Sequence, residues 1–115
     1  MANDFKNAIA QNVSNAAGGT TIYTTPATKP SIMLELDIAN TTQNVVEASV
    51  EILDSSVSAS AWRYLVKNAP VPSAGSLMVI AGQKIVLEAG DKVRITSSAA
   101  SVMDAIAAIL EDVNS

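Results

Sequence analysis

The sequence predicts an all-β protein: a single antiparallel β-sandwich or jelly-roll-like domain that carries an N-terminal arm. Short apolar runs alternate with turn-forming residues at nearly regular intervals between Tyr64 and Glu111. In residues 31–39 and 46–52 every second side chain is aliphatic. A length of 115 residues leaves room for one domain. Many short strands at even spacing are typical of sandwiches and jelly rolls.

Residues 1–19 differ from the predicted sandwich domain, residues 20–115, in their small and polar composition. Within them Phe5, Ile9 and Val13 recur every four residues, which fits one face of a short helix. Asn and Ser are poor helix formers, so the segment could equally be an extended arm. As an arm it would grip a neighbouring protein, with the spaced apolar side chains as anchors.

The clearest predicted strands are residues 31–39 and 46–52, where strict alternation indicates one buried and one solvated face. In the first, the even-numbered aliphatic residues are expected in the core and the odd-numbered residues in solvent. The polar residues 40–44 between the two segments predict a single antiparallel hairpin. The hairpin would place four acidic residues on one face: Glu35, Asp37, Glu47 and Glu51.

Further strands complete the predicted sandwich. Residues 61–67 are expected to carry their aromatic side chains on one face and their basic side chains on the other. Two prolines follow, and proline cannot donate to a β-ladder, so residues 68–75 should be a connection or an edge. The other predicted strands are Thr20–Thr25, Leu77–Ile80, Lys84–Glu88 and Lys92–Ser97.

The C-terminal residues 101–113 have two interpretations. Val102, Ile106 and Ile109 stand at helical spacing, and alanine, the best helix former, is frequent between them. The same residues could instead be the last strand of a sheet. Periodicity alone favours the helix slightly.

Composition excludes several classes of partner. Seven Lys and Arg stand against eleven Asp and Glu, and no basic run occurs that could neutralise nucleic-acid phosphates. No stretch approaches the roughly 20 apolar residues of a membrane helix. The N-terminus has no apolar core of a signal peptide. We therefore expect a protein that binds neither nucleic acid nor membrane.

Reactive side chains are equally scarce. The sequence has no Cys and no His, so it offers no thiolate ligand and no imidazole base. Neither a Ser-x-x-Lys pair nor a glycine-rich phosphate loop is present. The acidic residues of the predicted hairpin are better explained as a solvated face than as a calcium site. We expect no enzyme activity, no cofactor and no metal.

The residues Trp62, Arg63 and Tyr64 combine aromatic surface with charge, a combination found in interface hot spots. Core packing of the two aromatic side chains, with Arg63 outside, is the simpler interpretation. The candidate interface residues are Phe5, Ile9, Val13, Trp62, Arg63 and Tyr64.

Several motifs follow one another in a distinctive order. They are YLVKNAPVP at Tyr64–Pro72, GSL at Gly75–Leu77, QKIVLEAGD at Gln83–Asp91 and SSAAS at Ser97–Ser101, preceded by TTIYTTPA at Thr20–Ala27. In this order they resemble a family of small virion proteins of tailed phages, common in phages of aquatic bacteria. The similarity covers roughly residues 20–111.

The resemblance implies a β-sandwich that builds part of a virion: a head decoration or cement protein, or a neck, collar or tail-fibre component. It implies other virion proteins as partners, namely the major capsid protein or neck and tail proteins, and a homotrimer or other homo-oligomer. The protein would be made and assembled in the host bacterial cytoplasm. It also implies a final strand at Val102–Leu110, against the helical spacing. The alternative is a carbohydrate- or receptor-binding domain at a fibre tip.

Overall fold

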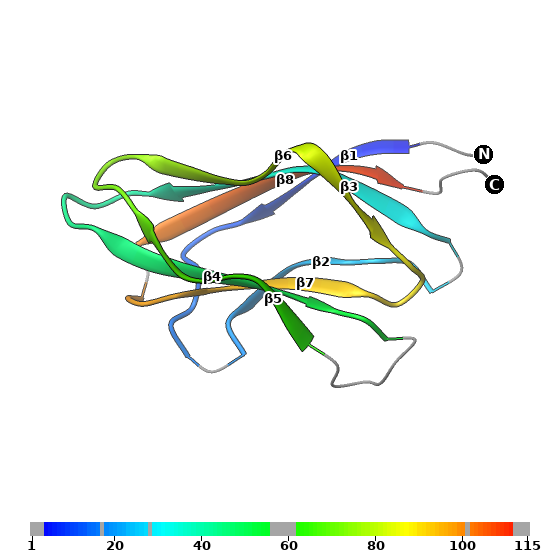
Figure 1. Ribbon diagram of the computed structural model, residues 1–115, viewed down its shortest axis with the longest axis horizontal. Helices are drawn as coiled ribbons and strands as arrows, with labels where there is room; N and C mark the ends of the chain where they lie inside the picture. Colours follow the sequence, from blue (N-terminus) through cyan, green and yellow to red (C-terminus); the bar gives the residue numbers. More distant parts are fainter. Residues whose placement is uncertain (1–3, 17, 28, 56–61, 101, 112–115) are drawn as a thin grey trace.

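The computed structural model describes residues 4–16, 18–27, 29–55, 62–100 and 102–111, which form two antiparallel four-stranded β-sheets packed face to face (Figure 1). Sheet A contains, in spatial order, β1 (Asp4–Ala10), β8 (Met103–Glu111), β3 (Ser31–Asn40) and β6 (Ser76–Leu87). Sheet B contains β2 (Thr20–Thr24), β7 (Lys92–Ser97), β4 (Val46–Leu53) and β5 (Trp62–Val71). The predicted all-β antiparallel sandwich is confirmed.

The strand order is that of a jelly roll. β1 pairs with β8, β2 with β7, β3 with β6 and β4 with β5, as in one long hairpin whose tip lies between β4 and β5. Winding this hairpin brings β8 beside β3 and β7 beside β4, which closes the two sheets. Each sheet ends in two edge strands, β1 and β6 in sheet A and β2 and β5 in sheet B.

Aliphatic side chains from the inner faces of both sheets fill the core. None of the buried residues in the described ranges is aromatic, as expected of a chain with only four aromatic residues. Such a core depends on close packing of methyl and methylene groups rather than on ring contacts. Its largest fully buried side chains include Met33, Leu36, Ile38, Leu87, Ile95, Met103 and Ile109.

The expectation of a helix or a free arm at the N-terminus is wrong. Residues 4–10 form β1, which pairs with β8 from Asp4 opposite Glu111 to Ala10 opposite Ala105. Val13 follows the strand and is fully buried in the core, where its N–H donates to the Met103 carbonyl. The sandwich therefore begins at β1 and not at residue 20. Backbone pairing favours the strand over a helix whose Asn and Ser residues would contribute little.

In the middle of β3 the alternation of buried and exposed side chains shifts by one residue, so the predicted orientation is wrong for the first part of the strand. A register irregularity between Met33 and Glu35 affects the pairing with both neighbouring strands. Such a bulge moves the following side chains to the opposite face. Met33 is consequently buried and Ile32 only half-buried, whereas Leu36 and Ile38 lie in the core as expected.

The predicted hairpin of residues 31–39 with residues 46–52 does not exist, because β3 lies in sheet A and β4 in sheet B. Residues 41–45 cross from one sheet to the other. Asn40, which is buried, holds this crossover: its Nδ2 donates to the carbonyls of Asn44 and Val71, and its Oδ1 accepts from the N–H and hydroxyl of Thr42. Two strands with alternating aliphatic residues can be neighbours in one sheet or can face each other across the core. Alternation alone therefore does not distinguish the two arrangements.

The C-terminal segment is a strand, as the resemblance implied and against its helical spacing. In β8 the side chains of Met103, Ala105, Ala107 and Ile109 are buried, with period two, while Ile106 is exposed. β8 is a central strand between β1 and β3. Alanine is not a favoured strand residue, but strand preference depends on packing, and here Ala105 and Ala107 are buried beneath the second sheet.

The middle of the chain forms fewer and longer strands than expected. β6 runs without interruption from Ser76 to Leu87, where two shorter runs were predicted. β5 continues through Pro70 to Val71, and its edge position tolerates the missing N–H. In β7 the side chains of Val93 and Ile95 are fully buried in the core. No helix that could cross a membrane occurs in the part of the chain described above.

Candidate interaction surfaces

The outer face of sheet A is unusually apolar. We call it the apolar face; it consists of the outward side chains of β1, β8, β3 and β6. Phe5 is 76% exposed, Val86 67% and Ile9 65%. Met78 and Ile106, also on this face, are exposed to 63% and 46%. Large apolar side chains gathered on one face, rather than scattered singly, mark an interaction site.

Strand register aligns these side chains in rows across the sheet. Ile9 pairs with Ile106, Ile106 with Asp37, and Asp37 with Met78. At the other end of the face Phe5, Leu110, Ile32 and Val86 form a second row in the same way. Glu35 and Ala108 lie opposite each other between the two rows. The apolar face thus consists of two rows of mainly hydrophobic side chains. The carboxylate of Asp37 belongs to one row, and that of Glu35 lies between the two.

Two shallow hollows mark this side of the molecule. One, of about 170 Å³, is lined mainly by apolar groups and includes Ile9, Ile106 and both Asp37 and Asp104. Asp37 Oδ1 is shielded from solvent and has no hydrogen-bond partner in the described part of the chain. An unpaired carboxylate oxygen in an apolar hollow is costly, and a donor from outside would relieve that cost.

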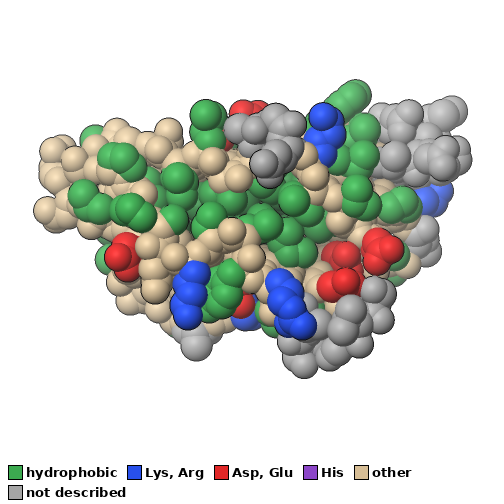
Figure 2. Space-filling model, viewed as in Figure 1, with side chains coloured by type: hydrophobic (Ala, Val, Ile, Leu, Met, Phe, Trp, Pro, Cys, Tyr) green, Lys and Arg blue, Asp and Glu red, His purple; other side chains and the backbone are tan. Residues whose placement is uncertain are grey.

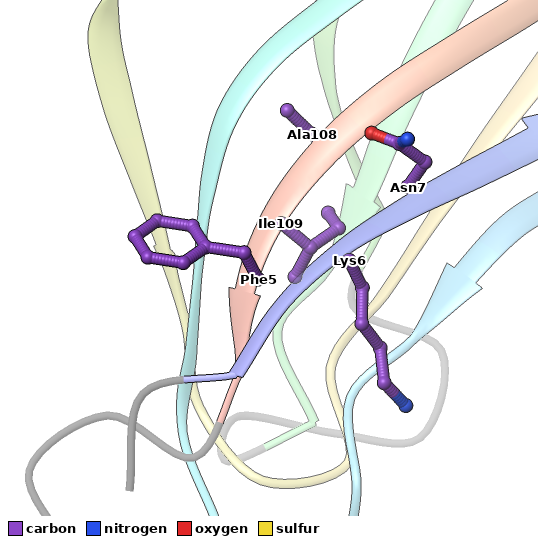
Figure 3. A pocket seen from close by; sticks show the side chains of 5 residues that line it. All are labelled: Phe5, Lys6, Asn7, Ala108 and Ile109. Carbon is purple, nitrogen blue, oxygen red and sulfur yellow. The ribbon is translucent and has the colours of Figure 1, made fainter.

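The second hollow, of about 260 Å³, lies between β1 and β8. Figure 3 shows Phe5 and Lys6 extending in different directions from β1, with Ala108 and Ile109 on the neighbouring strand. Lys6 Nζ lies 3.0 Å from Glu111 Oε1 and is thereby paired. This hollow continues the apolar face toward the edge of the sheet and holds no reactive group pair.

The outer face of sheet B carries a stacked cluster instead. Arg94 Nε and Nη2 donate to the two carboxylate oxygens of Glu51 at 3.0 and 3.1 Å. The guanidinium carbon of Arg94 lies 3.8 Å from the centre of the Trp62 ring. Beside it, Tyr64 is 53% exposed, and Lys67 Nζ lies 5.3 Å from the centre of its ring. Both aromatic rings therefore already have a cation against one face.

The candidate interface residues predicted from the sequence separate into three groups. Phe5 and Ile9 lie exposed on the apolar face, where a partner can reach them. Val13 is fully buried and cannot contact a neighbour directly, so it is removed from the set. The last group lies in or beside the cluster on sheet B and comprises Trp62, Arg63 and Tyr64. The simpler interpretation, core packing of the two aromatic side chains, is wrong, because Trp62 is only half-buried.

Sequence reasoning missed Met78, Val86 and Ile106, which contribute most of the remaining apolar face. Met78 and Val86 were placed in predicted strands and Ile106 in the final segment, without a prediction of which face their side chains occupy. The signal that could have revealed them is a strand with aliphatic residues in both phases, as in the LMVI of residues 77–80 and the IVL of residues 85–87. Such strands are either buried on both faces or expose an apolar face.

The predicted acidic face is also absent as a unit. Glu35 and Asp37 lie on sheet A, whereas Glu47 and Glu51 lie on sheet B. The counter-charge of Glu51 is Arg94, on the neighbouring strand β7. The error follows from the hairpin that joined the two strands in the prediction.

A different acidic group lies where the turn after β6 meets the end of β4. Carboxylate oxygens of Asp54, Glu88 and Asp91 lie within 4.8 Å of one another. Asp91 is buried, and its carboxylate accepts hydrogen bonds from the Ser55 N–H and hydroxyl and from the Glu88 N–H. These bonds join the turn at residues 88–91 to the end of β4, so Asp91 has a structural role.

Comparisons with protein-family models, curated proteins and solved structures find no match.

Proposed function

We propose that this chain is a non-enzymatic structural component of a bacteriophage virion that acts through protein–protein contacts. The single observation that carries the proposal is the apolar face, with five large hydrophobic side chains exposed on one sheet. The ordered motifs between Thr20 and Ser101, which resemble those of small phage virion proteins, supply the viral context. The jelly-roll order of the strands is compatible with this role, since the fold also serves viral capsids.

Burial of the apolar face would supply the binding energy. Covering an aliphatic or aromatic side chain completely is worth roughly 1.5–3 kcal/mol, and association costs several kcal/mol in lost freedom. Five such side chains on a rigid sheet offer enough surface for a stable contact without any reactive group. A contact made by a sheet face also leaves the backbone pairing of the sandwich intact.

The partners in this proposal are other virion proteins: the major capsid protein for a decoration or cement protein, or neck and tail proteins for a collar or fibre component. Quantitative mass spectrometry of purified virions of the encoding phage tests it. Copies in the hundreds per particle would indicate the head, and a small multiple of the tail symmetry would indicate the neck or tail. Absence of the chain from purified virions would contradict the proposal.

A pair of matched variants tests the role of the apolar face. Val86 and Val45 are exposed to 67% and 64%, but only Val86 lies on the apolar face. We expect Val86→Asp to abolish incorporation into virions, because a partner would bury the carboxylate against apolar groups. Val45→Asp should incorporate as the wild type does. Equal incorporation of both variants would show that the face is not used.

Carbohydrate or receptor binding is the second candidate, because Trp62 and Tyr64 lie near the carboxylate of Glu51 on the outside of sheet B. The cations against both rings weigh against it, since a sugar would have to displace them or use the opposite ring face. We expect no specific signal on a glycan array. Specific binding that Tyr64→Ala removes would favour this function over the first.

A further inference from the structure

Within the part of the chain that the structure describes, four charged side chains on two different surfaces have no partner of opposite charge. Glu35 and Asp37 on the apolar face form no ion pair with any residue in the described ranges. On β5, Arg63 donates to the carbonyl of Trp62, and Lys67 lies beside the ring of Tyr64; neither forms a further hydrogen bond or ion pair with a described residue. The described cations of sheet A lie on its edge strands, with Lys6 paired to Glu111 and Lys84 on β6.

The same two surfaces hold almost all of the exposed large hydrophobic side chains. Five lie on the apolar face, and Tyr64 and Leu65 lie on β5 between the two cations; Val45 is the remaining one in the described chain. We call Arg63, Tyr64, Leu65 and Lys67 the basic strip. Figure 2 shows the molecule from the side, as in Figure 1: hydrophobic side chains form a band between the levels of the two sheets, and Lys and Arg side chains lie both above and below this band.

We infer that the apolar face of one molecule binds the basic strip of a second copy of the same chain. The inference rests on the proposed function in assigning the chain to protein–protein contacts, and it names one partner of the apolar face. Each surface combines exposed apolar groups with unpaired charge, and the two charges have opposite sign. Contact would pair Glu35 and Asp37 with Arg63 or Lys67 while the apolar groups are covered.

Charge also decides against the symmetric alternatives. Two apolar faces packed on each other would place Glu35 and Asp37 of both copies in one interface without Arg63 or Lys67 to pair with them, and two basic strips would bring together Arg63 and Lys67 of both copies without those carboxylates. Like charges across an interface are costly. Contact between unlike surfaces avoids both arrangements.

The hollow that Asp37 lines provides a specific position in this contact for a cation of the second copy. The Oδ1 atom of Asp37 is shielded and has no hydrogen-bond partner among the described residues, so a donor from a second copy would satisfy it. The long side chains of Arg63 and Lys67 are exposed and carry several N–H donors each. Insertion of either cation among Ile9 and Ile106 would satisfy the carboxylate and bury the stem of the cation.

The two surfaces belong to different sheets, so each molecule presents both at once. Contacts of this kind are head-to-tail and form a closed ring where the rotation closes, or an open filament where it does not. β5 is also an edge strand, and such a contact would cover it against uncontrolled pairing.

Charge reversal tests the inference in solution. We expect the purified wild type to associate by sedimentation velocity, and the variants Glu35→Lys/Asp37→Lys and Arg63→Glu/Lys67→Glu each to weaken association at least about tenfold. The variant with all four substitutions should associate again, because the charges remain complementary. Circular dichroism and thermal melts identify variants that fail to fold; Glu35→Gln/Asp37→Asn and Arg63→Gln/Lys67→Gln then replace them, with smaller expected effects.

Mixing distinguishes unlike from symmetric contacts. Each double charge-reversal variant keeps one intact surface, so a mixture of the two should form heterodimers through a pair of wild-type surfaces. A wild type that stays monomeric at high concentration, or a pair of variants that associate unchanged, would overturn the inference. Failure of the fourfold variant to associate while folded would do so too. Incorporation into virions is measured separately: a monomer that incorporates refutes only this inference, and an oligomer absent from virions refutes only the viral role.

Discussion

The hydroxyl of Tyr23 donates a hydrogen bond of 2.6 Å to Glu111 Oε2 and thereby joins β2 of sheet B to β8 of sheet A. Ser31 Oγ lies 2.9 Å from the same hydroxyl, and Lys6 forms an ion pair with Glu111. Burial, and next the bond to Glu111, raise the pKa of Tyr23 to about 12. The polar cluster around the Tyr23 hydroxyl therefore connects the two sheets, beside the first residues of β1 and the last residue of β8.

Tyr23 makes stability depend on pH in the alkaline range. The pKa rises from 10.0 to about 12 on folding, so the folded state keeps the phenol proton longer than the unfolded state does. Stability from this group is fully present below pH 10 and is lost as the pH rises toward about 12. In urea titrations over this range we expect the free energy of unfolding to fall more steeply for the wild type than for Tyr23→Phe. Parallel curves for the two proteins would contradict the assignment.

Two neighbouring glycines should differ sharply in their tolerance of a methyl group. Both have left-handed backbone angles, φ +90° at Gly18 and φ +56° at Gly19. A Cβ at Gly19 would clash with the backbone carbonyl of Ile95, whereas at Gly18 the nearest atom is a side-chain nitrogen of Arg94 at 3.9 Å. We expect Gly18→Ala to cost about 1–2 kcal/mol and Gly19→Ala more than about 4 kcal/mol, measured by chemical denaturation. Equal costs would show that the approach of residue 19 to β7 is misplaced.

Asn40 should be the most sensitive polar residue of the crossover between the sheets. It is 3% exposed, and its side chain forms four hydrogen bonds to Asn44, Val71 and Thr42. Truncation leaves buried backbone groups without a partner, so we expect Asn40→Ala to lower the free energy of unfolding by about 2–4 kcal/mol. Asn44→Ala is the control, because Asn44 takes part through its backbone and should change stability by less than about 0.5 kcal/mol. A similar loss in both variants would refute this role.

The sequence was sufficient for the fold class because turn residues and short aliphatic runs are local signals. It failed where distant pairing decides. The bulge between Met33 and Glu35 depends on two neighbouring strands. The residues of β3 alone do not indicate that the side chains change faces there. Residues 102–109 have helical spacing but pair with β1 and β3, because a central strand gains backbone hydrogen bonds on both sides.

The candidate surfaces were predictable only in part. Phe5 and Ile9 were selected, although for a helix or an arm rather than for an edge strand of the sandwich. The apolar face could not be assembled from the sequence, because its members come from four strands that are distant along the chain. Joining residues 31–39 to 46–52 as a hairpin also combined the wrong carboxylates. Jelly-roll winding, which is a global property, determines which side chains share a face.

Oxidation of Met78 tests most directly whether the chain works by covering its apolar face. Met78 is 63% exposed on that face, whereas Met33 and Met103 are fully buried and serve as internal controls. Dilute hydrogen peroxide converts accessible methionine to the sulfoxide, which mass spectrometry quantifies residue by residue. In the free protein we expect Met78 to oxidise and the two buried methionines to resist. In purified virions Met78 should be protected; oxidation there at the rate of the free protein would contradict the account.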